Sequence, residues 1–268
     1  MKLILISIAG AYVIFVGALY LFQRSVLYQP DRTRPEPGYY GVPEMTAVDL
    51  ETEDGLDLLA WWRPPSDGTQ PVLVFFHGNA GHIGHRGDKV RYYLGRGWGV
   101  LLVAWRGYGG NPGNPTEKGL YADGRAALGF LRDREISPSR QVAYGESLGA
   151  AVVVELARET RFGAVVLEAP FTSVADVAQA MYRFVPVRPL VRDRFDSIDK
   201  ISQVSSPLLV IHGEADKIIP VGHGRRLHGA ANDPKTAHFV PAGGHNDLQG
   251  FGIAKEVAAF VERHLSPN

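Results

Sequence analysis

Between residue 72 and the carboxyl end, short runs of apolar residues alternate with segments whose apolar residues recur at helical spacing. The first run, residues 72–76 (VLVFF), is apolar throughout, which is typical of a strand buried on both faces of a sheet. Further strands are predicted at residues 100–104, 141–144, 164–167, 208–211 and 237–240, and helices at 116–134, 148–158, 221–230 and 251–265. This alternation predicts an α/β protein with a mostly parallel, doubly wound sheet covered by helices on both faces.

Two segments ahead of this region, residues 46–53 and 56–62, flank the turn Glu53-Asp54-Gly55 and predict a hairpin. We therefore expect one domain over residues 46–268. Within it, residues 171–200 are less regular and contain prolines at 186 and 189, so we expect them to form a small cap over a site.

The amino-terminal segment is the most apolar part of the chain. Residues 3–22 form a 20-residue stretch without a charged side chain, which as a helix is about 30 Å long, enough to span a bilayer core. We expect residues 1–24 to anchor the protein in a membrane by a single pass. A cleavable signal peptide is the alternative, with Lys2 as its basic end and Val16-Gly17-Ala18 as a poor cleavage site.

Residues 25–45 contain several prolines and glycines and predict an extended linker that leaves the membrane. The side of the membrane is only weakly encoded, because Lys2 and the α-amine before the span nearly balance the arginines at 24, 32 and 34 after it. The sequence assigns no oligomeric state.

Composition excludes several classes of protein. The chain has 28 Lys and Arg against 28 Asp and Glu, so it has no basic excess to neutralise nucleic-acid phosphates. It has no cysteine, which excludes disulfides, thiolate metal sites, cysteine nucleophiles and S-palmitoylation of this chain. Its 45% apolar residues argue against intrinsic disorder.

A Gly-x-Ser-x-Gly motif, Gly145-Glu146-Ser147-Leu148-Gly149, directly follows a predicted strand and opens a predicted helix. A nucleophile elbow requires this strand–turn–helix context, because side chains two residues before and after the serine would collide with neighbouring backbone. The motif therefore predicts Ser147 as a nucleophile. The alternative is a tight turn that uses glycine only for packing.

A nucleophilic serine needs a base, and the base needs an orienting carboxylate, in the chain order Ser, acid, His for this kind of fold. Asp216 follows the strand at 208–211 and is the predicted acid, with Glu214 as the rival. His245 lies in a glycine-containing loop directly after the last strand and is the predicted base. The other histidines after Asp216 fall in a strand or in helices, where we expect the pair at 223 and 228 to face water.

The loop after the strand at 72–76 reads His77-Gly78-Asn79-Ala80-Gly81. In enzymes with a nucleophile elbow, this loop donates one backbone N–H to the developing oxyanion, and the residue after the nucleophile donates the other. We assign these donors to Asn79 and Leu148, with Ala80 as the alternative to Asn79. We expect His77 to organise this loop.

Histidines 77, 82 and 85 with Asp88 raise the question of a metal site. Their spacing lacks the i, i+4 histidine pair of metalloprotease helices, so no metal is predicted.

The chain carries, in order, HGNAG at 77–81, RGYG at 106–109, GESLG at 145–149, EAPFTS at 168–173, His212-Gly213 with Asp216, and Gly244-His245. In these motifs and their spacing it resembles the membrane-anchored α/β-hydrolase-domain proteins, close to the eukaryotic palmitoyl-protein depalmitoylases and their bacterial relatives. The resemblance covers nearly the whole chain. It implies the α/β-hydrolase fold and serine hydrolase chemistry on esters or thioesters, with Ser147, Asp216 and His245 as the triad.

We therefore expect a membrane-anchored serine hydrolase that needs no metal or organic cofactor. Its expected partners are the membrane and a small-molecule, lipid or acyl-protein ester, with no nucleic acid among them. Apolar residues in the cap region favour medium-to-long acyl groups, although the same residues could simply pack the cap. The alternatives are an amidase or peptidase with the same triad, or a catalytically silent membrane scaffold.

Overall fold

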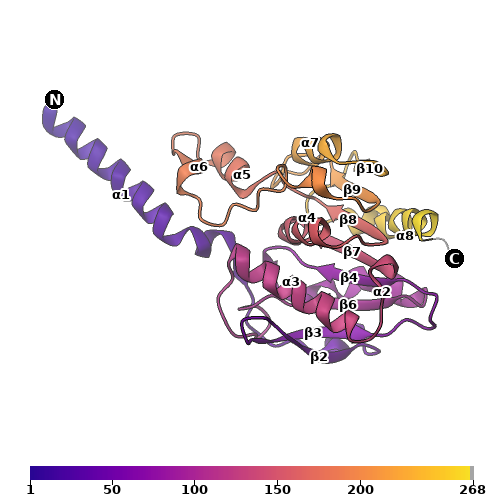
Figure 1. Ribbon diagram of the computed structural model, residues 1–268. Coiled ribbons are helices and arrows are strands. Elements are labelled where there is room, and N and C mark those ends of the chain that lie inside the picture. The colour runs from indigo at the N-terminus through magenta and orange to yellow at the C-terminus, as the bar shows by residue number, and fades with distance from the viewer. Residues whose placement is uncertain (266–268) are drawn as a thin grey trace.

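A mixed eight-stranded sheet forms the centre of the protein in the computed structural model, which describes residues 1–265 (Figure 1). The strand order is β10-β9-β8-β7-β4-β6-β3-β2, and all neighbours from β10 to β6 run parallel. The hairpin partners β2 and β3 run antiparallel, as do β3 and β6. The strands are β2 (Thr46–Glu51), β3 (Asp57–Arg63), β4 (Val72–Phe76), β6 (Gly99–Val103), β7 (Gln141–Glu146), β8 (Ala164–Glu168), β9 (Leu208–Gly213) and β10 (Lys235–Val240). The predicted fold class is confirmed.

The sheet buries apolar side chains on both faces, because successive side chains of a strand point to opposite sides. In β4, Val72, Val74 and Phe76 join one core, and Leu73 and Phe75 join the other. The first core lies under α3 (Glu117–Arg132), α4 (Leu148–Glu159) and α7 (Gly222–Ala230), and the second lies under α2 (Gly87–Gly95) and α8 (Ile253–His264). This arrangement leaves the carboxyl ends of the parallel strands free to carry a site.

The helix α2 is absent from the sequence-based expectation. Its buried apolar residues, Val90, Tyr93 and Leu94, are few, and it begins and ends at glycines. Its apolar stripe is therefore too short to stand out in the sequence, and its helix forms by packing on the sheet.

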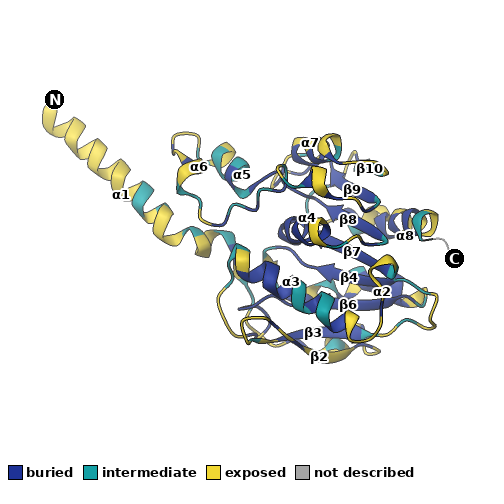
Figure 2. Ribbon diagram, viewed as in Figure 1, coloured by how far each residue is buried: buried dark blue, intermediate teal, exposed yellow. Residues whose placement is uncertain are grey.

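The apolar amino-terminal segment forms one long helix, α1 (Lys2–Leu27), with no buried residue (Figure 2). Within residues 1–265, it is the one helix long and apolar enough to cross a membrane, with a mean hydropathy of 2.3. Figure 1 shows that α1 leaves the domain beside the cap and points away from the sheet.

The segment predicted as an extended linker is packed against the domain. Tyr28, Val42 and Met45 are buried, and the short strand β1 (Gln29–Pro30) pairs in parallel with β5 (Ala80–Gly81). These contacts join the end of α1 to the loop after β4. No local sequence pattern predicts them.

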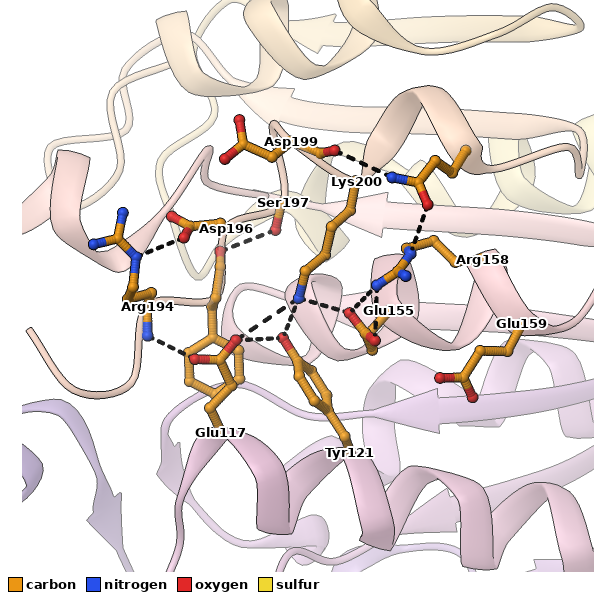
Figure 3. Close-up of polar contacts among 12 residues, drawn as sticks. Glu117, Tyr121, Glu155, Arg158, Glu159, Arg194, Asp196, Ser197, Asp199 and Lys200 are labelled. Atoms are coloured by element: carbon orange, nitrogen blue, oxygen red, sulfur yellow. Dashed lines mark hydrogen bonds and ion pairs between the residues drawn. The ribbon is translucent and has the colours of Figure 1, made fainter.

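The region expected to form a cap contains α5 (Val174–Met181) and α6 (Val187–Leu190). Polar contacts fix residues 194–200, where the chain passes from the cap back to the domain (Figure 3). Lys200 Nζ lies 2.6 Å from Glu155 Oε2 and 3.0 Å from the Tyr121 hydroxyl, and the Arg194 N–H donates to Glu117 at 2.7 Å. The base of the cap is therefore fixed to α3 and α4.

Candidate active site

Ser147 lies at a sharp turn between β7 and α4. Its backbone has φ 52° and ψ −110°, a conformation that non-glycine residues rarely adopt. A Cβ at Gly145 would collide with Ala150, and one at Gly149 would collide with the Phe76 carbonyl. The two glycines therefore permit the turn that the sequence predicts, and the turn presents Ser147 above the end of the sheet.

The structure brings Ser147, His245 and Asp216 together from the ends of three different segments. His245 Nε2 lies 3.1 Å from Ser147 Oγ, and His245 Nδ1 lies 2.7 Å from Asp216 Oδ2. An ionised carboxylate only accepts hydrogen bonds, so Nδ1 carries the proton and Nε2 is free to accept from the serine hydroxyl. This geometry allows His245 to act as a base toward Ser147.

Asp216 is held by several donors. Its Oδ1 accepts the backbone N–H groups of Ile218 and Ile219, each at 2.8 Å, and His212 Nε2 lies 3.3 Å from Oδ2. Burial opposes ionisation, but the hydrogen bonds from His212, His245 and Ile219 outweigh it and hold the pKa of Asp216 well below its usual range. Asp216 therefore stays charged next to His245.

The rival acid, Glu214, is paired with Arg225 on the surface, whereas His245 Nδ1 is paired with Asp216.

The loop after β4 borders the same cavity as Ser147 and His245. The Asn79 carbonyl accepts from the Gln29 N–H at 2.9 Å and the Tyr108 hydroxyl at 2.8 Å, and its side-chain amide donates to the Leu27 carbonyl at 2.8 Å. Within residues 1–265, neither the Asn79 N–H nor the Leu148 N–H donates to a protein acceptor. Both donors are therefore available for an oxyanion next to Ser147.

His77 is fully buried, and its Nδ1 lies 2.8 Å from the Gly78 carbonyl. Burial lowers the pKa of His77 to about 3, so this histidine is neutral and its Nδ1–H donates within the loop. This placement agrees with a role in organising the loop.

Three ligand-type side chains outside this centre lie close together, and they differ from the set considered in the sequence. Asp31, His82 and His85 have ligand atoms within 4.8 Å of one another. His82 Nδ1 accepts the Gly84 N–H at 3.1 Å, so in the neutral ring Nε2 carries the proton and points it toward Asp31 and Tyr40. Ligation through Nε2 would require this proton on Nδ1, where the Gly84 N–H already donates, so the donor set does not favour a metal.

His223 does not face water as expected. It is buried, and its Nδ1 lies 2.8 Å from the Thr172 hydroxyl. The expectation was wrong because α7 packs on β9, and His223 lies on the face of the helix that packs there. A polar residue in a helix with few apolar residues gives no sign of which face is buried.

Comparison with known proteins assigns a family to this arrangement. A family model described as serine aminopeptidase, S33, matches residues 67–198. The Mycobacterium tuberculosis protein Rv2307c is 41% identical over 243 residues, which cover 90% of this chain and 85% of that relative. The protein bem46 of Schizosaccharomyces pombe is 32% identical over 270 residues, covering 92% of this chain and 88% of that relative. The chain belongs to the α/β-hydrolase family.

Two further comparisons agree with this membership. The human alpha/beta hydrolase domain-containing protein 17B is 36% identical to this α/β hydrolase over 210 residues, covering 75% of this chain and 69% of that relative. The solved structure of the Pyrococcus furiosus esterase Pf2001 superposes with a TM-score of 0.73 at 22% identity, covering 89% of this chain and all of that one. The latter likeness shows a shared fold.

In this α/β hydrolase, a buried charge cluster lies beneath the elbow. No motif in the sequence predicts this cluster. Lys89 Nζ lies 2.8 Å from both Glu146 and Glu168, and Arg86 lies 2.7 Å from Glu146 and 3.0 Å from the Ala80 carbonyl. Arg86 thus joins the residue before Ser147 to the loop that carries Asn79. The sequence shows only two basic residues soon after that loop, Arg86 just before α2 and Lys89 in its first turn, and this pattern is not distinctive.

A cavity of about 420 Å³ opens onto Ser147 and His245. Its walls come from α1, from the cap and from the loop of Asn79, and they are mostly apolar. The volume lies within the range typical of small-molecule sites, so the hydrolase has room for a substrate at the serine.

Proposed function

We propose that this protein is a serine hydrolase that cleaves carboxylic ester or thioester bonds with Ser147, His245 and Asp216 as a triad. The observation that carries the proposal is the continuous hydrogen-bonded chain from Ser147 Oγ through His245 to Asp216 at 3.1 and 2.7 Å. The family membership supports hydrolase chemistry, and the cavity supplies a binding space next to the nucleophile.

In the proposed reaction, Ser147 Oγ attacks the acyl carbonyl while His245 Nε2 takes the hydroxyl proton. The resulting oxyanion accepts the N–H groups of Asn79 and Leu148. The intermediate then collapses, His245 gives its proton to the leaving alcohol or thiol, and an acyl-enzyme remains on Ser147. Water, deprotonated by His245, releases the acid and restores the serine. Apart from water, these steps use only groups of this chain.

We also propose that α1 anchors the protein in a membrane by a single pass. Its length, its apolar composition and its exposure over nearly all of its surface support this role, because water is an unfavourable surrounding for such a helix. The proposed partners are the membrane and an ester or thioester substrate.

The Ser147→Ala variant tests the mechanism. We expect turnover of p-nitrophenyl esters to fall roughly 10⁴-fold or more, because the nucleophile is lost and only binding and oxyanion stabilisation remain. A matched control is Ser205→Ala, which removes an exposed hydroxyl on the domain surface and should leave turnover unchanged. Undiminished turnover in a folded Ser147→Ala protein would contradict the proposal.

A fluorophosphonate probe separates an enzyme from a catalytically silent scaffold of the same fold. Ser147 Oγ displaces fluoride from the probe only if His245 activates it, so wild-type protein should be labelled and His245→Ala should not. Peptide and amide substrates in the same assay then distinguish an esterase from an amidase or peptidase.

A further inference from the structure

The carboxyl-terminal half of α1 forms one wall of the cavity at Ser147. Val16, Leu19, Gln23 and Leu27 are half-buried and recur every three to four residues, so they share one face of the helix. This face lines the cavity, whereas Leu21 and Phe22 on other faces remain exposed. A helix suited to crossing a membrane thus also borders the candidate active site.

Polar contacts fix α1 in this position. Arg24 forms a two-pronged ion pair with Asp193 at 2.8 and 3.2 Å, and Asp193 also accepts the Glu117 N–H at the start of α3. The Gln23 side chain accepts the Arg192 N–H at 2.8 Å and donates to the Leu190 carbonyl at 3.2 Å. The helix is therefore held in a definite register against the cap.

The cap supplies the opposite wall. Val177, Met181 and Val185 line it, and Ser147 and His245 also border the cavity. The cavity follows α1 from Leu27 to Val16, which is about 16 Å along the helix axis. An acetyl group needs only a small part of that length.

The space between the walls is a cleft that opens to the surface, and apolar side chains form most of its lining. Here a cavity of about 420 Å³ remains between apolar side chains and leads to a nucleophile. An apolar chain is the occupant whose chemistry matches these walls, because it loses contact with water without leaving polar groups unpaired.

We propose that the acyl chain of the substrate lies between α1 and the cap, so that the anchor helix is itself the wall that sets acyl-chain length. This inference rests on the proposed serine hydrolase function. Leu19 is its specificity-determining residue, since it lines the cavity about 12 Å along α1 from Leu27. The bond that is cleaved lies at Ser147, and the chain extends from there along α1 toward the apolar half of the helix.

The test compares Leu19→Trp with Leu21→Trp in full-length protein reconstituted in phosphatidylcholine vesicles. Both variants make the same substitution on α1, but only residue 19 faces the cavity. We expect Leu19→Trp to lower the ratio of kcat/KM for p-nitrophenyl palmitate to that for p-nitrophenyl acetate about tenfold or more, because added volume excludes part of a long chain. Leu21→Trp should keep the wild-type ratio.

A second pair, Leu19→Ala and Leu21→Ala, tests the opposite change. Removing volume at residue 19 should shift the preferred chain toward longer acyl groups, and the same change at residue 21 should not. Suppose that wild-type protein is labelled by fluorophosphonate, but the residue 19 and residue 21 variants have equal kcat/KM ratios. This result would overturn the acyl wall and leave the serine hydrolase proposal standing. Failure of wild-type protein to label would instead overturn the proposed function.

Discussion

At the scale of single residues, a buried charge cluster adjoins the elbow through Glu146. Glu168 is fully buried, and its backbone carbonyl accepts the Ser147 N–H at 2.8 Å. Burial opposes ionisation of Glu146, but Lys89 and Arg86 outweigh it and hold the pKa of Glu146 below its usual range. Burial also opposes the charge of Lys89, but Glu168 and Glu146 outweigh it and raise the pKa of Lys89. Glu146 and Lys89 therefore both keep their charges next to the nucleophile.

Lys89→Met should destabilise the fold. It leaves two buried carboxylates facing each other with one cation fewer, so the free energy of unfolding should fall by about 3–5 kcal/mol. Loss of Lys89 raises the pKa of Glu146, so this group holds its proton more tightly in the folded variant than in wild type, and the variant regains stability as the pH falls. Denaturant unfolding at several pH values measures this. Lys118→Met, on the exposed face of α3, is the control and should change little. A Lys89→Met protein as stable as wild type at neutral pH would show that the cluster is not coupled to the fold.

At the scale of elements, the cap and α1 behave as one unit. The Tyr12 hydroxyl donates to the Phe184 carbonyl at 2.7 Å, and the Arg192 guanidinium lies 4.4 Å from the centre of the Tyr20 ring. These two contacts are eight residues apart on α1, which corresponds to about 12 Å along its axis. If α1 lies in a bilayer with Tyr20 and Arg192 at its surface, the tip of the cap lies within the lipid. The side chain of Phe184 at this tip is 91% exposed.

Phe184→Ser should therefore weaken turnover of substrates embedded in vesicles. Removing a large apolar side chain from the lipid costs roughly 1.5–3 kcal/mol of insertion free energy, whereas a water-soluble ester should be hydrolysed as before. Tyr39→Ser is the control, because Tyr39 is 85% exposed but lies in the segment packed on α2. Activity on vesicle-embedded and soluble esters measures the difference. Equal losses in the two variants would contradict insertion of the cap.

At the scale of the whole molecule, α1 is both the proposed anchor and a part of the site. Cleavage after Ala18, as in a signal peptide, would remove Val16 from the cavity wall. It would also place a new, charged amino terminus at Leu19, next to apolar side chains, which is costly without a partner. We therefore expect the helix to be retained.

The mature protein should therefore keep residues 1–27 and stay with membranes. High salt should not release it, because an equal number of acidic and basic residues leaves no net charge to hold it at anionic lipids. Detergent should release it, since the proposed attachment is the apolar contact of α1 with lipid. Intact-mass measurement of the extracted chain checks retention, and a soluble chain that begins at Leu19 would contradict it.

The sequence by itself determined the sheet, most of its strands and helices, and the family. These follow from local patterns: apolar runs for buried strands, helical spacing for helices, and glycines at 145 and 149 that allow the turn at Ser147. It also predicted which serine, acid and histidine meet, and the structure places them within hydrogen-bond distance; their catalytic roles stay a prediction.

Only the tertiary structure decided what surrounds that centre. The contacts of Asn79 with Leu27, of Arg86 with Glu146 and of Arg24 with Asp193 join residues 52, 60 and 169 positions apart. No local pattern encodes such pairs, because each side chain is ordinary in its own segment and acquires its partner only when the segments pack. For the same reason, the sequence shows α1 as an apolar helix, and only the fold shows that one face of it borders the cavity at Ser147.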